Sequence, residues 1–221
     1  MIGAVLFDVD GTLIDSNDLH AAAWREAFLH FGVDLPHDVI RGQIGKGGDN
    51  LMPALLPAEL VERSQEEIDE YRSDLFKRDY LPRVVPFPGV RDLFERLRSD
   101  GKRIVLASSA KAEEVHYHLG VIGAGDLVEA TTSSDDVAHS KPDPDIFAAA
   151  LAKVAPLSAH QVVVVGDTPY DCEAAAKLGI RSIGFRSGGF PEQWLSQAGA
   201  AELYDGPAHL LSSYEHSLLV R

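Results

Sequence analysis

Short, mostly apolar runs recur along the chain and predict buried strands. The first run, residues 4–7, reads Ala-Val-Leu-Phe, and residues 162–165 are four consecutive valines. Continuous apolar runs of this length are typical of strands buried on both faces of a parallel sheet. The other predicted strands are residues 103–107 and 181–185, with weaker candidates at 127–130 and 201–204.

Helical periodicity fills the intervals between these runs in the second part of the chain. Leu93, Phe94 and Leu97 lie on one face of a helix that Gly101 ends. Further helices are expected over 111–119, over 145–154 with Asp143-Pro144 at its start, over 169–178, and after residue 207. Strands that alternate with helices in this way predict an α/β fold with a doubly wound parallel sheet.

The segment between the first two strands has a different pattern, in which helical periodicity dominates. Residues 42–48 form a glycine-rich patch, and the charged segment 59–77 carries a single apolar stripe. The first helical face of the segment is formed by Leu19, Ala23, Ala27 and Phe31, with Trp24 and Phe28 beside it. We therefore expect an all-helical unit over residues 16–83, inserted into an α/β core that consists of residues 1–15 and 84–221.

Composition narrows the classes of partner and compartment. The 221 residues are 45% hydrophobic, and the formal net charge is −14. Such an acidic protein repels phosphate backbones, so no nucleic-acid partner is expected, and an anionic substrate needs a local positive pocket built from lysines and a metal. A single cysteine, Cys172, suits a reducing compartment. The chain starts its first strand without an apolar leader, and no run is long enough to span a membrane, so a cytoplasmic protein without membrane contact is expected.

Polar residues follow the predicted strands at the positions where each strand ends. Asp8 and Asp10 follow the first strand, Ser108 follows the second, and Asp167 follows the valine run, while Lys141 lies in a loop before a helix. The carboxyl ends of parallel strands lie at one edge of the sheet, where open α/β sheets bind ligands. These side chains are therefore expected to converge there.

Each of these residues taken alone also has a simpler structural explanation. Ser108 or Ser109 can cap the helix that follows, Asp167 can cap the helix at Pro169, and a single lysine is usually solvated. The simpler explanations do not account for the complete order of Asp-x-Asp, Ser, Lys and Gly-Asp-x-x-x-Asp, which ends at Asp171.

In this order the motifs resemble those of the haloacid dehalogenase (HAD) superfamily. The four motifs match Asp8, Asp10 and Thr12, then Ser108, then Lys141, and finally Asp167 with Asp171. The helical insertion after the first motif is similar to the cap of the subgroup that contains phosphatases and β-phosphoglucomutase-like enzymes. The resemblance implies a core sheet of strand order 3-2-1-4-5 with an inserted all-helical cap domain.

The resemblance also implies roles for the acidic residues. Asp8 is expected to be the nucleophile that forms an aspartyl-phosphate, and Asp10 is expected to act as the acid and base. A Mg²⁺ cofactor is implied, with the Asp8 carboxylate, the Asp10 backbone carbonyl and Asp167 as ligands. Asp171 is expected to orient Lys141 or a water on the metal.

The remaining motif residues are expected to bind the phosphoryl group. Ser108 offers a hydroxyl donor, and Lys141 supplies the positive charge that lets Asp8 approach an anionic phosphate. The turn residues Gly11 and Thr12 and the neighbouring Ser109 are expected to line the same phosphate site.

The cap is expected to carry substrate selectivity. Gly45-Lys46-Gly47-Gly48 has no preceding strand and no Walker Lys-Ser/Thr pair, so it is interpreted as a cap turn facing the active site. Lys46 and Lys77-Arg78 are candidates to contact the far end of a substrate, with surface charge as the alternative. His20 is a candidate substrate-binding residue, with a hinge or surface position as the alternative.

The leading functional hypothesis is Mg²⁺-dependent hydrolysis of a small-metabolite phosphomonoester, similar to phosphoglycolate or a sugar phosphate. A β-phosphoglucomutase-like mutase is the alternative, disfavoured because the cap turn has no arginine for a second phosphate. A haloacid dehalogenase has no need of Asp10, and a silent binding module is expected to have lost one of the motif residues. The pattern leaves the substrate open, together with the choice between monomer and dimer.

Overall fold

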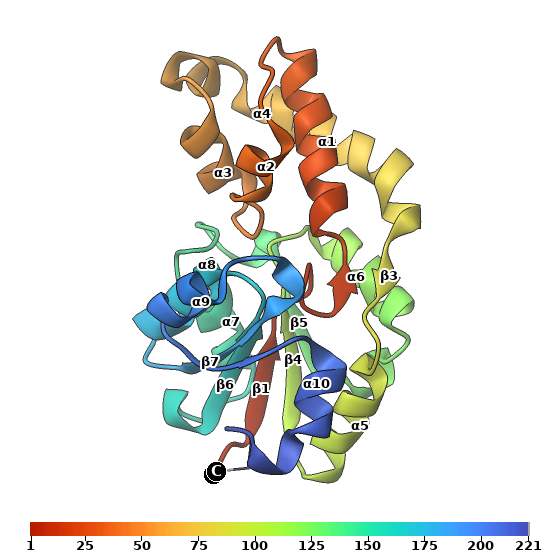
Figure 1. Cartoon of the computed structure of the whole chain (residues 1–221), viewed down its shortest axis with the longest axis vertical. Helices are drawn as coiled ribbons and strands as arrows, with labels where there is room; N and C mark the ends of the chain where they lie inside the picture. Colours follow the sequence, from red (N-terminus) through yellow and green to blue (C-terminus); the bar gives the residue numbers. More distant parts are fainter. Residues whose placement is uncertain (221) are drawn as a thin grey trace.

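The computed structural model describes residues 1–220 and places a helical unit above an α/β body (Figure 1). The body is built on a sheet with the order β5-β4-β1-β6-β7-β8, in which all neighbouring strands are parallel. The strands are β1 (Ala4–Phe7), β4 (Arg103–Ala107), β5 (Ala130–Thr132), β6 (Val162–Gly166), β7 (Arg181–Phe185) and β8 (Ala200–Tyr204). In chain order this is 3-2-1-4-5, as predicted, with a sixth strand added at the β7 edge.

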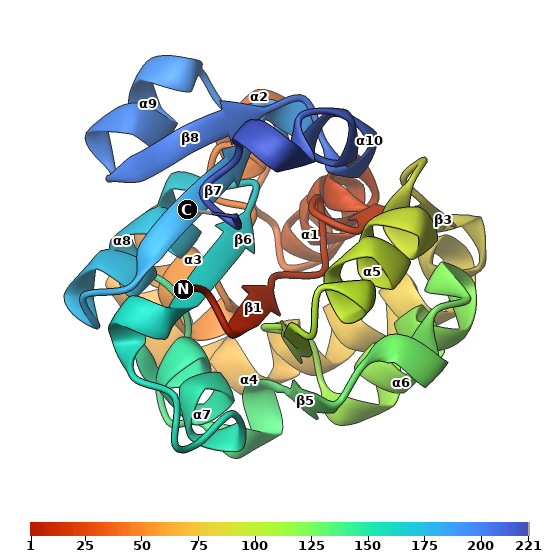
Figure 2. The same cartoon turned by 90° about the horizontal axis from the view of Figure 1, so that it is seen from below.

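Both faces of the sheet are buried, because alternate residues of each strand enter different hydrophobic clusters. In β1, Val5 and Phe7 belong to one cluster, whereas Ala4 and Leu6 belong to the other. Helices α5 (Val90–Ser99) and α10 (Pro207–Ser212) cover the first face, and α7 (Asp145–Lys153) and α8 (Pro169–Lys177) cover the second (Figure 2). This arrangement explains why the strands lack polar alternation.

The structure corrects two local predictions in this body. Residues 127–130 were expected to form a strand, but Gly125–Leu127 is a 3₁₀ turn and β5 starts only at Ala130. The helix after Asp143-Pro144 starts at Asp145, with Pro144 as the residue that precedes it and no side-chain cap. The side chain of Asp143 instead accepts a hydrogen bond from Lys177.

Within residues 1–220, the remaining elements of the body are two helices and four 3₁₀ turns. They are α6 (Ala112–Ile122), α9 (Glu192–Gln197) and the 3₁₀ turns Ser134–Asp136, Ala159–Gln161, Arg186–Gly188 and Tyr214–His216. Cys172 on α8 is fully buried, and burial raises the pKa of its thiol to about 12, which keeps it protonated at neutral pH.

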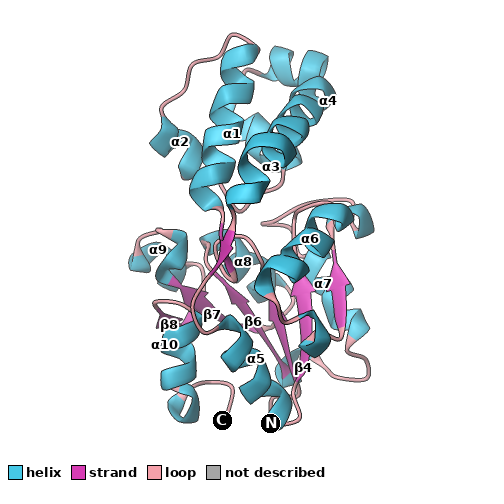
Figure 3. Cartoon of the chain, turned by 90° about the vertical axis from the view of Figure 1, so that its right-hand side faces the viewer, coloured by secondary structure: helices cyan, strands magenta, loops and turns pink. Residues whose placement is uncertain are grey.

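The helical unit consists of helices that stand together beyond the sheet (Figure 3), and it has a hydrophobic cluster of its own. Its helices are α1 (Asn17–His30), α2 (His37–Arg41), α3 (Gly48–Leu55) and α4 (Ala58–Leu75), which continues through Phe76–Tyr80 and Leu81–Arg83. The strands β2 (Ile14–Asp15) and β3 (Val85–Pro86) pair antiparallel where the chain enters and leaves this unit. The boundaries at 15/16 and 83/84 stay a prediction. In residues 1–220 no helix combines the length and apolarity needed to cross a membrane.

Candidate active site

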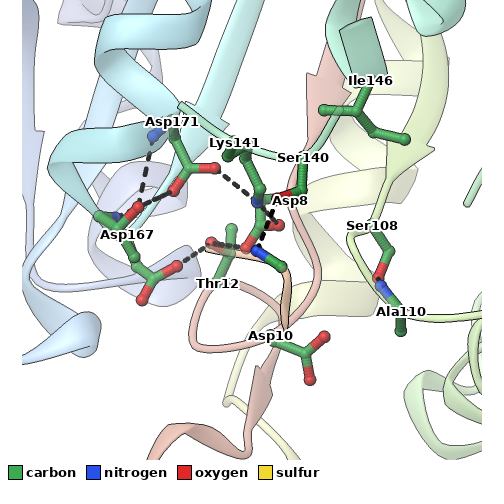
Figure 4. A network of polar contacts seen from close by, with 12 residues as sticks. Asp8, Asp10, Thr12, Ser108, Ala110, Ser140, Lys141, Ile146, Asp167 and Asp171 are labelled. Carbon is green, nitrogen blue, oxygen red and sulfur yellow. Dashed lines mark hydrogen bonds and ion pairs between the residues drawn. The ribbon is translucent and has the colours of Figure 1, made fainter. Parts of the chain in front are cut away.

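Lys141 links two buried carboxylates at the carboxyl edge of the sheet (Figure 4). Its Nζ lies 2.5 Å from Oδ1 of Asp8, which follows β1, and 2.8 Å from Oδ1 of Asp171 on α8. The lysine is 1% exposed. Burial disfavours its charge, but the two carboxylates outweigh burial and raise the pKa of Lys141 above its ordinary value. The alternative of a solvated loop lysine is therefore wrong.

A third buried carboxylate, Asp167, follows β6 and lies beside this group. It accepts hydrogen bonds from the Thr12 hydroxyl (2.9 Å to Oδ1) and from Nδ2 of Asn17 (2.7 Å to Oδ2). Burial, reinforced by the charge of Asp171, raises the pKa of Asp167 to about 7. Gly11 is required here, because its φ is +78° and an added Cβ would lie 2.2 Å from Oδ2 of Asp167.

Asp8 is destabilised as an anion by the same surroundings. Burial raises its pKa well above the ordinary value, against the opposing charge of Lys141, and the carboxylates of Asp171 and Asp167 add to the increase. One oxygen each from Asp8, Asp167 and Asp171 lie within 4.8 Å of one another. Such a cluster of hard oxygen donors suits a divalent cation such as Mg²⁺, whose charge relieves the mutual repulsion.

Asp171 also shapes the start of α8. Thr168 is the cap residue of this helix, and Oδ2 of Asp171 accepts from the backbone N–H (3.0 Å) and the hydroxyl (2.7 Å) of Thr168. The alternative in which Asp167 caps this helix is wrong. Because one oxygen of Asp171 completes the cap and the other contacts Lys141, the helix start aligns the lysine.

Asp10 belongs to a separate network that reaches the cap. Its Oδ1 lies 2.8 Å from Nε2 of His20 and accepts from the Ser16 hydroxyl at 2.7 Å. Nδ1 of His20 lies 2.5 Å from the guanidinium of Arg72 on α4. Arginine only donates, so Nδ1 must accept, and His20 is a neutral imidazole that donates from Nε2 to Asp10.

The pKa of His20 is shifted in the direction that favours the neutral imidazole. Burial lowers the pKa of His20 below its ordinary value, although Asp10 opposes the change. Burial raises the pKa of Asp10, but the interactions with His20 outweigh it and leave the pKa below its ordinary value. His20 is buried and lines the active-site cavity, so the alternative of a surface histidine is wrong.

The two serines after β4 differ in their surroundings. The Ser108 hydroxyl is buried, accepts from the backbone N–H of Ala110 at 3.0 Å, and lies apart from the carboxylate network in Figure 4. Ser109 lines the cavity, and its buried Oγ has no hydrogen-bond partner within residues 1–220. Neither serine caps α6, whose cap residue is Lys111.

These groups face a cavity of about 330 Å³ between the core and the helical unit. The glycine-rich turn that was expected to face the active site does line this cavity, and it packs directly on the core. At Gly47 an added Cβ would lie 2.5 Å from Cβ of Ser140, so any side chain would push the turn away.

Lys46 lines the cavity, but its amine donates to Gln43 (2.6 Å) and lies over the Tyr170 ring. Lys77 and Arg78 form ion pairs outside the cavity.

Ser140, the residue before Lys141, holds the cap on the core. Its hydroxyl accepts from the Gly47 N–H (3.0 Å) and donates to Asp49, while its own N–H donates to Oδ2 of Asp49 (3.0 Å). Nδ2 of Asn50 donates to the Ser140 carbonyl at 3.0 Å. The helical unit is thereby bonded directly to the segment that carries Lys141.

The family comparison agrees with this geometry. A family model described as haloacid dehalogenase-like hydrolase matches residues 5–185. The chain belongs to this family. This membership confirms the family resemblance that the motifs around Asp8, Ser108, Lys141 and Asp167 indicated, and the parallel sheet confirms the predicted fold.

Individual relatives of this HAD-family chain cover most of its length. It is 28% identical over 180 residues to a phosphorylated carbohydrates phosphatase of Thermotoga maritima, covering 81% of this chain and 83% of that protein. It is 29% identical over 186 residues to a phosphoglycolate phosphatase of Nitrosospira multiformis, covering 80% of each. A crystal structure of a hydrolase from Pseudomonas syringae superimposes with a TM-score of 0.90 at 28% identity, covering 98% of this chain and 99% of that one.

Several residues of the HAD-family site were missed by the sequence reasoning. Asn17, Asp49, Arg72, Glu114 and Ser140 line the cavity or bond its acidic groups. Ser140 directly precedes Lys141, and Asn17 closely follows the first motif. Their positions in the sequence could therefore have indicated that they belong to the site. The other three depend on how the cap packs on the core.

We expect the Ser140→Ala variant to have about tenfold lower kcat/KM, because the hydroxyl's hydrogen bonds to the cap stabilise the closed state by about 1–2 kcal/mol. The free energy of unfolding is expected to change little, since an open cap is not an unfolded protein. Steady-state kinetics with a phosphomonoester, together with denaturant unfolding, measure the two effects. Ser212→Ala is the control, because that hydroxyl bonds a carbonyl on the exposed surface. An unchanged kcat/KM for Ser140→Ala would contradict the role of this contact.

Proposed function

We propose that this protein is a Mg²⁺-dependent phosphatase that hydrolyses a small phosphomonoester through an aspartyl-phosphate on Asp8. The observation that carries the proposal is the placement of Asp8 at the end of β1, where Lys141 holds its carboxylate and the cavity lies above it. The lysine charge offsets the repulsion between a carboxylate and an incoming phosphate. The phosphatases among its relatives support the same chemistry.

The residues of the site account for both halves of the reaction. An oxygen of Asp8 forms a bond to phosphorus while the bond from phosphorus to the alcohol oxygen breaks, and Asp10 protonates that oxygen. Water then attacks the phosphorus of the aspartyl-phosphate, Asp10 accepts its proton, and inorganic phosphate leaves as Asp8 is regenerated. Asp10 enters the first step as the carboxylic acid, and the proton that it gives to the alcohol oxygen is restored when it accepts a proton from water in the second step. The hydrogen bonds from His20 and Ser16 favour its carboxylate, which is the form that accepts the water proton.

The phosphoryl group needs donors besides Lys141. Ser109 lines the cavity with an unpartnered hydroxyl, and Ser108 keeps its hydroxyl hydrogen available because the oxygen only accepts from Ala110. Thr12 lies between Asp8 and Asp167 and fixes their relative positions, with 3.1 Å from its hydroxyl to Oδ2 of Asp8. We assign phosphate binding to the two serines, the Gly11–Thr12 turn (residues 11–12) and Lys141.

The metal ligands proposed are the Asp8 carboxylate, the Asp10 backbone carbonyl and Asp167, with Asp171 holding Lys141. When bound, Mg²⁺ neutralises charge on the phosphoryl oxygens and on the two carboxylates. The raised pKa values of Asp8 and Asp167 and the proximity of their oxygens support this assignment.

Removing the metal is expected to lower phosphate release from p-nitrophenyl phosphate about 100-fold or more, because the uncompensated carboxylates then repel the substrate. Added Mg²⁺ should restore the rate. The measurement is a colorimetric assay after EDTA treatment and gel filtration, with residual metal determined by elemental analysis and folding followed by circular dichroism. Full activity in a folded, metal-free sample would contradict the Mg²⁺ requirement.

The mutase alternative is less well supported. A mutase must hold a second phosphate, but the cap cations Lys46 and Arg72 are engaged with Gln43 and His20. Conversion of glucose 1-phosphate to the 6-phosphate without phosphate release would favour the mutase. Chloride release from 2-chloropropionate would indicate a dehalogenase, and no turnover across a broad panel of phosphoesters would indicate a silent binding module.

A further inference from the structure

A second contact between the helical unit and the core lies beside the proposed metal ligands. Arg41, the last residue of α2, donates from Nε to Asp18 (2.7 Å) and from Nη2 to the backbone carbonyl of Gly188 (2.5 Å). Its guanidinium also lies 5.9 Å from the centroid of the Phe190 ring. Arg41 therefore bridges a carboxylate of the helical unit and the core loop 186–190, which follows β7.

The loop 186–190 packs directly against the proposed metal site. An added Cβ at Gly188 would lie 2.3 Å from the backbone oxygen and from Oδ2 of Asp167, so the loop backbone touches this residue. The Ser187 hydroxyl donates to the carbonyl of Gly11 at 2.6 Å. A displacement of the loop would therefore disturb both Asp167 and the turn of the first motif.

The next residues of the helical unit contact the short stretch that joins two of the three clustered carboxylates. The Tyr170 hydroxyl donates to the carbonyl of Gly42 at 2.7 Å. At Gly45, whose φ is +106°, an added Cβ would lie 2.6 Å from Cγ2 of Thr168. The segment 41–45 therefore rests on this stretch as well as on the loop after β7.

These contacts are significant because the clustered carboxylates oppose their own arrangement. Oxygens of Asp8, Asp167 and Asp171 lie within 4.8 Å of one another, and like charges at this separation repel. Lys141 pairs with the first and the last of them, whereas Asp167 forms no ion pair in the described part of the chain. Without a bound cation, contacts from outside must hold Asp167 in the cluster, and the segment 41–45 supplies them.

We propose that Arg41 and Tyr170 are positioning residues for the metal site, so that seating of the helical unit on the core and metal binding favour each other. Neither side chain lines the active-site cavity. The inference rests on the proposed metal site and adds a role for residues outside it. The coupling is reciprocal: contacts that hold Asp167 in place raise the affinity for the metal, and bound metal stabilises the same contacts.

The first test measures Mn²⁺ binding to the metal-free full chain without substrate. Mn²⁺ takes the same oxygen ligands as Mg²⁺, and electron paramagnetic resonance measures the ion that stays free. Arg41→Met removes the bridge to Gly188, and Tyr170→Phe removes only the hydroxyl that bonds Gly42. Each variant is expected to raise the Kd for Mn²⁺ about fivefold or more, because the seated state that favours metal binding is less populated.

Arg25→Met is the matched control for these variants. Arg25 contacts the Asp34 carboxylate and the Leu35 carbonyl, so both of its partners belong to the helical unit itself. Its loss is expected to leave the Kd for Mn²⁺ unchanged. Circular dichroism in EDTA verifies that each protein is folded, and Tyr170→Phe keeps the test valid if Arg41→Met does not fold.

The second test measures the coupling in the opposite direction, by hydrogen exchange in the wild type. The Gly47 N–H donates to Ser140 of the core, so it is protected only while the helical unit is seated. Saturating Mg²⁺ is expected to slow amide exchange in residues 41–48 about fivefold or more. A contact that only supports the fold would give the same exchange with and without the metal.

Two kinds of failure are distinguishable in these measurements. If the folded, metal-free wild type binds no Mn²⁺, the proposed metal site itself is wrong. If it binds Mn²⁺ but the folded variants bind the ion as tightly as the wild type, the positioning role is wrong. Exchange in residues 41–48 that does not respond to Mg²⁺ would likewise exclude the coupling.

Discussion

Replacing Asp8 by asparagine is expected to lower kcat ~10⁴-fold or more, because loss of an attacking nucleophile removes the covalent route entirely. Asparagine has nearly the same shape, so Lys141 keeps its contact with Asp171 and the fold should be preserved. The measurement is the rate of phosphate release at saturating substrate and Mg²⁺, compared with the wild type. Acid-quenched wild-type protein is expected to retain labelled phosphate, and the Asp8→Asn variant is expected to retain none. This difference would locate the phosphoryl group on Asp8.

The control for this variant is Asp15→Asn, since Asp15 is exposed on β2 close in sequence to the first motif. It should retain wild-type kinetics. A folded Asp8→Asn protein with phosphatase activity near that of the wild type would show that Asp8 is not the nucleophile.

Replacing Lys141 by methionine is expected to have the largest effect on stability, lowering the free energy of unfolding by about 3–5 kcal/mol at neutral pH. The methionine fills most of the space but leaves the carboxylates of Asp8 and Asp171 buried without their shared cation. Activity should fall with it, by about 10³-fold in kcat/KM, because the charge that admits the phosphate is lost. Denaturant unfolding in EDTA and steady-state kinetics in Mg²⁺ measure the two effects.

The stability loss in this variant should depend on pH. Without Lys141 the pKa of Asp8 rises further above its unfolded value. The folded state then binds more protons than the unfolded chain, so its stability falls as pH rises. In the wild type the raised pKa of Lys141 provides stability below the ordinary lysine pKa, which is lost as pH rises above it. The difference between the two proteins should therefore narrow from about pH 8 to about pH 5.

An exposed lysine provides the comparison for this measurement. Lys177→Met removes an ion pair with Asp143 at the surface and should change the free energy of unfolding by less than about 1 kcal/mol at either pH. If Lys141→Met is as stable as the wild type near neutral pH, or if its deficit does not change with pH, the buried pair does not have the assigned energetic role.

The strands of the core could be predicted because strands buried on both faces consist of consecutive apolar residues, which are visible in the local sequence. Arg103–Ala107 and Arg181–Phe185 form strands with the predicted bounds, and the valine run extends by one residue to Gly166. The prediction at 127–130 was wrong because Leu127 and Val128 belong to a turn that packs on the first core cluster, and apolarity alone does not distinguish a packed turn from a strand.

The motif residues could be located from the sequence alone, but the hydrogen bonds and ion pairs between their side chains could not be predicted without the tertiary structure. Asp8, Lys141, Asp167 and Asp171 are recognisable from their order and from their positions after strands. The distances that make them one site depend on the parallel sheet bringing the ends of β1 and β6 side by side. His20 was assigned on less evidence, because its role depends on Arg72, which is 52 residues away on another cap helix.

The sequence by itself determined the family, the strand and helix alternation, and the reactive groups, because each of these depends on residue type at short spacing. Only the tertiary structure decided how the cap meets the core. Ser140 and Asp49 are 91 residues apart, and Glu114 and residues of α4 line the same cavity, so no local sequence pattern could predict that these groups lie together. They follow from the packing of a helical unit with its own apolar cluster against the carboxyl edge of the sheet, where glycines such as Gly47 permit backbone approach.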